Sequence, residues 1–211
     1  MPLIEKIKSE SGTIGIWELQ EPADDLLKNC QLHPADSERL NAFRSEKRCR
    51  EFLASRLILQ NLFPGYPQIV YTETVGKPVL KDSELHISIT HSANLAAVYI
   101  SEKKAGIDVE QLDRNINKVV QRFVAPQEID FIEKGSHPQL AKIMLWAAKE
   151  AIYKCSGLPG ILFNKQILIE DFDYRAQNHF SGKLLYQGIT TKYRLNYHIV
   201  KNNVLVYCVE E

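Results

Sequence analysis

Hydrophobic and polar positions follow two different periods along the chain, and each period predicts a different kind of element. Residues 85–90 read Leu-His-Ile-Ser-Ile-Thr, an alternation that predicts a half-buried strand. Residues 95–101 are mostly apolar and predict a partner strand, joined to the first through the four-residue loop 91–94. Residues 38–63 instead repeat their apolar positions at helical spacing, and a Pro-Gly pair ends that predicted helix.

The second half of the chain mixes the same two periods. Residues 140–155 carry its strongest helical pattern, with stop signals at Ser156 and Gly157. Short helical turns are expected at 119–123 and 128–133. The remaining predicted strands span residues 14–19, 69–71, 105–110, 166–172, 183–187, 193–199 and 204–209.

This order of elements predicts an α+β protein with two similar halves, residues 1–102 and 103–211. Each half is expected to be a small antiparallel sheet packed on a long helix, with the active site in a cleft between the halves. The 211 residues suffice for one large domain or two small ones. The halves share no sequence repeat, so their pseudo-two-fold relation is an expectation from element order alone.

Composition and charge exclude several classes of protein. Hydrophobic residues make up 45% and charged residues 25%, which excludes a disordered or collagen-like chain. Lys plus Arg and Asp plus Glu each total 26, without the basic excess of a general nucleic-acid binder. No apolar run approaches the roughly 18 residues of a membrane span, and no signal peptide is recognisable. Four widely spaced cysteines are typical of reduced thiols. We therefore expect a cytoplasmic protein without nucleic-acid or membrane partners.

Two carboxylates stand out in residues 106–110, Gly-Ile-Asp-Val-Glu. Alternate residues of a strand share a face, so Asp108 and Glu110 are expected on one face while Ile107 and Val109 point into the core. Neighbouring carboxylates repel each other unless they are exposed or a hard cation lies between them. Both a solvated strand face and a metal site therefore agree with this pattern.

A second pattern lies on the predicted helix 140–155. Trp146, Glu150 and Lys154 follow each other at intervals of four residues and form one stripe. Glu150 and Lys154 alone would be an ordinary surface ion pair, worth about 0.2–0.5 kcal/mol. The large aromatic side chain in the same stripe indicates a partly buried face, where a charged pair points to chemistry.

A third pattern combines a turn and a strand end in the first half. Lys77 lies on the turn Gly-Lys-Pro, and Thr90, His91 and Ser92 lie where the strand 85–90 ends. An ammonium group, an imidazole and hydroxyl groups can all donate hydrogen bonds to phosphate. A hairpin whose polar residues satisfy their own turn would look the same.

The order and spacing of these motifs are more specific than any one of them. Together they resemble the 4′-phosphopantetheinyl transferase superfamily, and the length resembles its larger single-chain (Sfp-like) branch. The resemblance covers about residues 38–162. The motifs that carry it are Gly76-Lys77-Pro78, Thr90-His91-Ser92, Gly106-Ile107-Asp108-Val109-Glu110, Arg122 to Glu128, and Trp146-x-x-Lys149-Glu150-Ala151-x-x-Lys154.

The resemblance implies an enzyme that transfers the 4′-phosphopantetheine group of coenzyme A to a serine of an apo carrier protein. The product released is adenosine 3′,5′-bisphosphate. Asp108, Glu110 and Glu150 would hold Mg²⁺, which carboxylates alone do not distinguish from Mn²⁺. Glu150 would act as the base for the serine hydroxyl or position that base, and Lys154 would lie near the α-phosphate or leaving group. Glu150 and Lys154 are thus the predicted catalytic residues.

The resemblance also implies a set of coenzyme A contacts. Thr90 stands where many members have Ser, a change that keeps the hydroxyl group. Trp146 is expected to pack behind Glu150, and Glu128 matches a family position without an assigned role. The predicted contacts are Lys77, Thr90, His91, Lys149 and Lys154, with Arg50, Arg44 and Arg48 for the 3′-phosphate.

The partner implied is an acyl carrier protein or a peptidyl or polyketide carrier domain. It is expected to dock near the apolar stretch 158–162, and this chain is expected to be a monomer. The alternatives are a non-catalytic coenzyme A or carrier-binding module of the same fold and, from another class, a metal-dependent nuclease. The zero net charge and the four-residue spacing of Glu150 and Lys154 argue against a nuclease. The sequence leaves open which carrier is modified and whether acylated coenzyme A is accepted.

Overall fold

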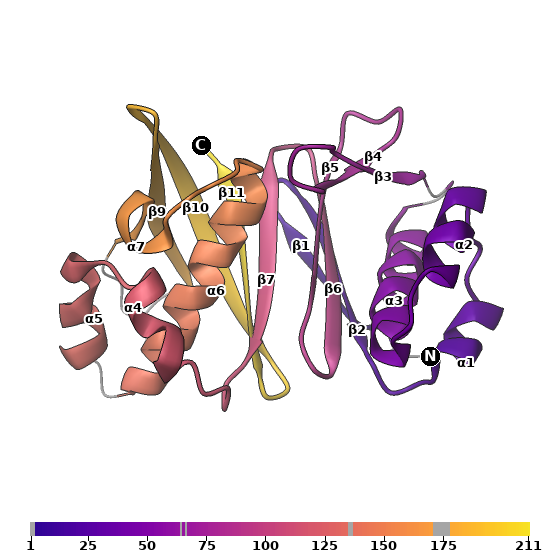
Figure 1. Ribbon diagram of the computed structural model, residues 1–211, viewed down its shortest axis with the longest axis horizontal. Coiled ribbons are helices and arrows are strands. Elements are labelled where there is room, and N and C mark those ends of the chain that lie inside the picture. Colours follow the sequence, from indigo (N-terminus) through magenta and orange to yellow (C-terminus); the bar gives the residue numbers. More distant parts are fainter. Residues whose placement is uncertain (1–2, 64, 66, 135–136, 171–177) are drawn as a thin grey trace. The chain divides into compact units, whose positions relative to one another are not determined.

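The computed structural model describes residues 3–63, 65, 67–134, 137–170 and 178–211. The chain divides into two compact units, Met1–Glu102 and Lys103–Glu211. Each unit contains an antiparallel sheet packed with helices (Figure 1). The predicted α+β class is confirmed.

The first unit is built on a four-stranded sheet with the strand order β1-β2-β6-β5. Helix α3 packs against β2 and β6, and a separate two-stranded sheet pairs β3 with β4. The strands are β1 (Leu3–Ser9), β2 (Gly12–Glu18), β3 (Ile69–Tyr71), β4 (Pro78–Leu80), β5 (His86–His91) and β6 (Leu95–Ser101). The helices are α1 (Ala23–Lys28), α2 (Pro34–Asn41) and α3 (Glu46–Leu62), and neither α1 nor β1 was predicted.

The predicted single helix 38–63 is wrong, because the chain breaks it into α2 and α3. Ser45 takes an extended conformation, with φ −109° and ψ 121°, immediately before α3. The break lets Phe43 pack edge-on against Phe52, with ring centroids 5.4 Å apart. On one continuous helix these two residues would be separated by about 13.5 Å along the axis. The packing of Phe43 on α3 is therefore possible because the helix is interrupted between α2 and α3.

The second unit contains a five-stranded sheet with the order β7-β11-β10-β9-β8. The predicted strand 166–172 is described only as a three-residue strand, and its last two residues lie outside the described ranges. The strands are β7 (Ala105–Gln111), β8 (Ile167–Ile169), β9 (His179–Tyr186), β10 (Ile189–Val200) and β11 (Asn203–Glu210). The helical segments are η1 (Asn117–Val119), α4 (Val120–Phe123), η2 (Pro126–Glu128), α5 (Ile129–Lys134), α6 (Pro138–Ser156) and α7 (Phe163–Gln166).

Helix α6 packs across β7 and β11 (Figure 1). A Cβ atom built on Gly106 of β7 would lie only 1.9 Å from the carbonyl oxygen of Ala151. The facing helix turns carry small, fully buried residues, Ala147 and Ala151 among them. The helix ends as predicted at Gly157, whose φ of 62° is a left-handed conformation that glycine adopts without strain. Glycine on the strand and alanine on the helix thus bring two backbones together.

Substitution of Gly106 by Ala should therefore destabilise the second unit strongly. The added methyl group meets backbone atoms of α6, which cannot rotate away, so the strand or the helix must shift. We expect a loss of about 3 kcal/mol or more in the free energy of unfolding. Urea unfolding measures it, with Ser181→Ala at an exposed position of β9 as the control. Equal stability of the two variants would contradict the close approach.

Candidate active site

Asp108 and Glu110 lie on the face of β7 that α6 covers. Their register partners on β11 are Val206 and Val204, which belong to the hydrophobic core under α6. Directly paired residues of an antiparallel sheet share a face. This corrects the expectation that the acids face away from the core, because both are buried on its side of the sheet.

Lys154 joins α6 to β7 through one of these acids. Its Nζ lies 2.6 Å from Oδ1 of Asp108 and donates a second hydrogen bond to the carbonyl oxygen of Ile107 at 3.2 Å. The side chain of Asp108 is far less exposed than that of Lys154. A hydrogen-bonded partner of opposite charge is what a buried carboxylate requires.

Two donors hold the other acid of β7. Trp146 Nε1 donates to Oε1 of Glu110 at 2.7 Å, and Arg114 donates to the same oxygen. The indole ring itself packs against Phe123 and Phe163, with centroid distances of 5.1 and 5.8 Å. The indole N–H of Trp146 thus fixes Glu110.

Glu150 lies one helical turn before Lys154 on α6 and has the most perturbed carboxyl group of the site. Burial raises its pKa to about 7, and the negative charges of Asp108 and Glu110 act in the same direction. Lys154 and Arg114 oppose this rise only in part. A carboxyl group with a pKa near neutrality can accept a proton during turnover at physiological pH.

The acids of the second unit suit a divalent cation in their chemistry. Carboxylate oxygens are the donors that Mg²⁺ prefers, and the mutual effect of Asp108, Glu110 and Glu150 on the pKa of Glu150 means that they share one neighbourhood. Among the residues that the structure describes, no three His, Cys, Asp or Glu side chains form a ready metal cage. Lys154 and Arg114 balance two of the acids instead.

Lys149 does not face this site, which corrects the expectation that it contacts phosphate. Its side chain is fully buried, and Nζ lies 2.7 Å from Oε2 of Glu128. The same nitrogen donates to the carbonyl oxygens of Phe123, Phe163 and Ile167 at 2.7, 3.1 and 2.7 Å. These partners occupy all the donor capacity of an ammonium group. Lys149 therefore fastens α6 to three neighbouring segments.

Glu128, for which the sequence assigned no role, completes this buried cluster. Its second oxygen, Oε1, accepts the backbone N–H of Ile169 at 2.8 Å, and Oε2 also accepts the N–H of Ala125. Both carboxylate oxygens are thus satisfied inside the protein. The Lys149–Glu128 pair is structural and places α7 and β8 beside α6.

In the first unit, a polar groove of about 200 Å³ gathers some of the predicted coenzyme A contacts. Arg48 of α3 and His91 at the end of β5 both line it. Arg39 also lines the groove, and its guanidinium carbon lies 3.8 Å from the centre of the Tyr71 ring. Guanidinium groups and aromatic rings together suit a ligand that carries phosphate and a flat ring.

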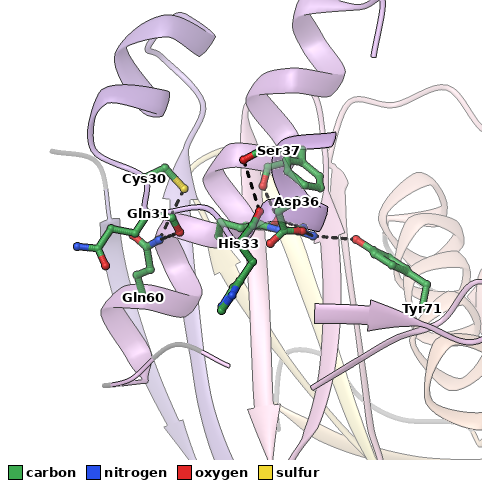
Figure 2. Close-up of polar contacts among 10 residues, drawn as sticks. Cys30, Gln31, His33, Asp36, Ser37, Gln60 and Tyr71 are labelled. Atoms are coloured by element: carbon green, nitrogen blue, oxygen red, sulfur yellow. Dashed lines mark hydrogen bonds and ion pairs between the residues drawn. The ribbon is translucent and has the colours of Figure 1, made fainter. Parts of the chain in front are cut away.

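A buried ion pair supports the wall of this groove. Arg56 donates to Oδ1 of Asp36 at 2.7 Å and to the hydroxyl group of Tyr71 at 3.0 Å, and its guanidinium stacks 3.7 Å over Phe52. Figure 2 shows Asp36 and Tyr71 joined through this network. Arg56 thereby ties α2 and β3 to α3 and fixes the ring over which Arg39 lies.

A larger hollow of about 510 Å³ lies elsewhere in the first unit but has less chemistry. Its lining is mainly neutral and includes Gln31, His33 and Gln60 (Figure 2). Nearby, Gln60 donates to the carbonyl oxygen of Gln31 at 2.7 Å. Burial raises the pKa of the Cys30 thiol to about 11, so this cysteine is no nucleophile near neutral pH. None of the predicted site residues lines this hollow.

The other predicted contacts of the first unit are more scattered. Lys77 ends a turn in which its backbone N–H bonds to Oγ1 of Thr72. Thr90 is buried within β5, and Arg44 is exposed in the break between α2 and α3. Arg50 donates to the carbonyl oxygen of Leu19 instead of lining the groove described above. Arg50 therefore does not line this groove, and its role at the 3′-phosphate stays a prediction.

Three residues of these sites escaped the sequence interpretation: Arg39, Tyr71 and Arg114. Arg39 falls in the helix that was predicted as continuous, and no role was assigned to it from the sequence. Tyr71 lies on a short strand that was predicted, but its partner strand, Pro78–Leu80, was not. Arg114 follows Glu110 by four residues, but the chain has left β7 there, and no periodic signal connects the two.

The second unit is thus a strand–helix site of three acids and a lysine, a composition suited to chemistry on phosphate groups. Residues 104–208, about half of the chain, match the family model of the 4′-phosphopantetheinyl transferase superfamily. The chain belongs to that superfamily, as its motifs predicted.

Two curated relatives and one solved structure are similar to parts of the chain. The 4′-phosphopantetheinyl transferase psf-1 of Bacillus pumilus is 30% identical over 94 residues, 43% of this chain and 40% of the relative. The 4′-phosphopantetheinyl transferase gsp of Aneurinibacillus migulanus is 27% identical over 110 residues, 51% of this chain and 46% of the relative. The matches therefore span less than half the length of either relative.

The solved structure is the holo-[acyl-carrier-protein] synthase of Neisseria meningitidis. It is 22% identical, with a TM-score of 0.40, over 51% of this chain and 97% of that one. Separately, none of the helices in the described ranges has the length and apolarity needed to cross a membrane.

Replacing Lys149 by Met should cost about 3–5 kcal/mol of stability, because the buried carboxylate of Glu128 would lose its cation. Urea unfolding of Lys149→Met, Glu128→Gln and the double variant measures this. The double variant should be more stable than the sum of the single losses predicts. A Lys149→Met protein of normal stability that binds coenzyme A poorly would restore the phosphate role.

The raised pKa of Glu150 predicts a pH-dependent stability. In the metal-free protein with chelator, the pKa of Glu150 is about 7 in the folded state, against 4.5 when the chain is unfolded. The folded state therefore loses stability as the pH rises from about 4.5 to 7, because the carboxyl group gives up its proton in the unfolded chain while the folded protein retains it. Glu150→Gln should therefore stabilise the protein by about 1–3 kcal/mol near pH 8 and by little near pH 5. Urea unfolding at both pH values tests this, with Glu133→Gln at an exposed position as control. An equal gain at both values would contradict the assignment.

Proposed function

We propose that this protein is a 4′-phosphopantetheinyl transferase of the larger single-chain branch. It transfers the 4′-phosphopantetheine group of coenzyme A to a serine of an apo carrier protein and releases adenosine 3′,5′-bisphosphate. The observation that carries the proposal is the meeting of Asp108 and Glu110 on β7 with Glu150 and Lys154 on α6, inside the half that matches the superfamily.

Each of these residues has a distinct task in the proposed reaction. Asp108, Glu110 and Glu150 would hold Mg²⁺, which when bound neutralises charge on the pyrophosphate of coenzyme A. The serine oxygen forms a bond to the β-phosphorus, the one that carries the pantetheine arm, and the pyrophosphate P–O bond breaks. Glu150, with its pKa near 7, is suited to take or steer the serine proton.

Lys154 supplies the positive charge for the departing group. Its ammonium is held at Asp108 by a 2.6 Å ion pair, so it is positioned before a substrate arrives. The leaving bisphosphate carries additional negative charge, which a fixed cation stabilises. Removal of Lys154 should therefore affect turnover more than coenzyme A affinity.

Coenzyme A would bind in part through the groove of the first unit. Arg39, Arg48 and His91 provide charge for phosphate groups, and Tyr71 provides an aromatic surface for a ring. Lys77, which lies directly before β4, and Thr90 of β5 remain proposed contacts.

The proposed partner is an acyl carrier protein or a peptidyl or polyketide carrier domain. An apolar docking point is available at Leu162, whose residue surface is 55% exposed directly before α7. The neighbouring Phe163 packs on Trp146 and Tyr153, so the segment is anchored to α6. The protein is proposed to act as a monomer.

Intact-mass spectrometry of an apo carrier protein tests the reaction directly. With coenzyme A and Mg²⁺ the carrier should gain one phosphopantetheine, and chelator should prevent the gain. Glu150→Gln and Asp108→Ala should each lower the rate by a factor on the order of 100 or more. Glu133→Gln, an exposed acid of α5, should leave the rate unchanged.

The negative results separate the competing interpretations. Normal turnover by Asp108→Ala would refute the metal assignment. Failure with several unrelated carriers, while calorimetry still shows coenzyme A binding, would favour a non-catalytic module. Absence of coenzyme A binding would overturn the proposal as a whole.

A further inference from the structure

Glu51 is a carboxylate in a groove that otherwise suits an anion. It lies on α3 between Arg48 and Phe52, lines the same groove and is only 8% exposed. A negative charge at this place repels phosphate and reduces the attraction between phosphate and the neighbouring guanidinium groups. A buried carboxylate also requires a partner that donates a hydrogen bond.

His91 is that partner. Oε1 of Glu51 lies 3.3 Å from Nδ1 of His91 and 3.6 Å from Nζ of Lys47. The side chain of Lys47 is 66% exposed, so water screens this second contact. Oε1 itself is buried, and no donor in the described part of the chain makes a hydrogen bond to it. An N–H group of the imidazole ring would satisfy this oxygen.

The two nitrogens of an imidazole are linked in their function. The group that Nδ1 contacts fixes the tautomer and the ring orientation, and thereby where Nε2 points. A carboxylate at Nδ1 also favours the protonated ring, in which both nitrogens donate. His91 lines the groove with half of its side chain exposed, so it can reach a ligand there.

We propose that Glu51 is a positioning residue that holds Nδ1 of His91 and so directs Nε2 toward a phosphate group in the groove. The identity of that phosphate, part of coenzyme A, rests on the proposed function. The contact between the two side chains does not.

Glu51→Gln separates positioning from simple electrostatics, because the two predict opposite signs. If Glu51 only adds negative charge, its removal strengthens the binding of an anion. If it positions His91, its removal weakens coenzyme A binding, and we expect a loss of roughly fivefold. Calorimetry with coenzyme A measures this, and Glu84→Gln at an exposed position of the same unit serves as control.

A double-mutant cycle with His91→Gln identifies the route of the effect. Glu51→Gln should weaken binding in the native background and should not weaken it further when His91 is already replaced. Tighter binding by Glu51→Gln would overturn the proposal, as would equal losses in both backgrounds. Circular dichroism checks that each variant is folded.

Nuclear magnetic resonance of ¹⁵N-histidine-labelled protein gives a readout that needs no nucleotide. His91 is assigned by its absence from the His91→Gln spectrum. We expect its Nδ1 to be protonated in the native protein and to lose that preference in Glu51→Gln. Unchanged imidazole shifts would overturn the positioning role. The native protein could instead bind no coenzyme A while these shifts change as expected. The proposed function would then fail, and the positioning of His91 by Glu51 would be upheld.

Discussion

The close contact between β7 and α6 is the constraint on which the candidate active site depends. Gly106 lets the strand approach the helix backbone so closely that even a methyl group would overlap the carbonyl oxygen of Ala151. Two and four residues further along β7, Asp108 and Glu110 face the same helix. The long side chains of Lys154 and Trp146 then reach them at hydrogen-bond distance. A wider spacing would leave buried acids without donors, which is costly in free energy.

Burial gives Lys149 and Lys154 of α6 different roles, one structural and one in the candidate active site. Lys149 and Lys154 are five residues apart and therefore lie on different faces of the helix. Lys149 is fully buried, and its ammonium is saturated by one carboxylate and three carbonyl groups. Lys154 keeps 29% of its side chain exposed beside the carboxyl group with the strongest pKa shift. Only the second ammonium is placed to meet a ligand.

Periodicity predicted the α+β class, the sheet strands near both sites and the end of α6 at Gly157, because these depend on local patterns. It failed where tertiary contacts override them. Phe43 packs on Phe52 and interrupts a helix that looked continuous. The acids of β7 face the core, because Lys154, Trp146 and Arg114 compensate them there, and a strand pattern records no such partners. The resemblance assigned Lys149 to a phosphate contact, because the sequence does not show that its ammonium is buried against Glu128 and three carbonyl groups.

The zero net charge of the chain hides two local concentrations of opposite sign. The second unit gathers three acids, where burial, aided by the charges of Asp108 and Glu110, raises the pKa of Glu150 to about 7. The first unit gathers arginines around a groove, and the buried one among them, Arg56, is neutralised by Asp36. Such local charges act over a few ångströms, well within the Debye length of about 8 Å at physiological salt. Phosphate groups complement the arginines of the groove, and a divalent cation complements the acids of the second unit.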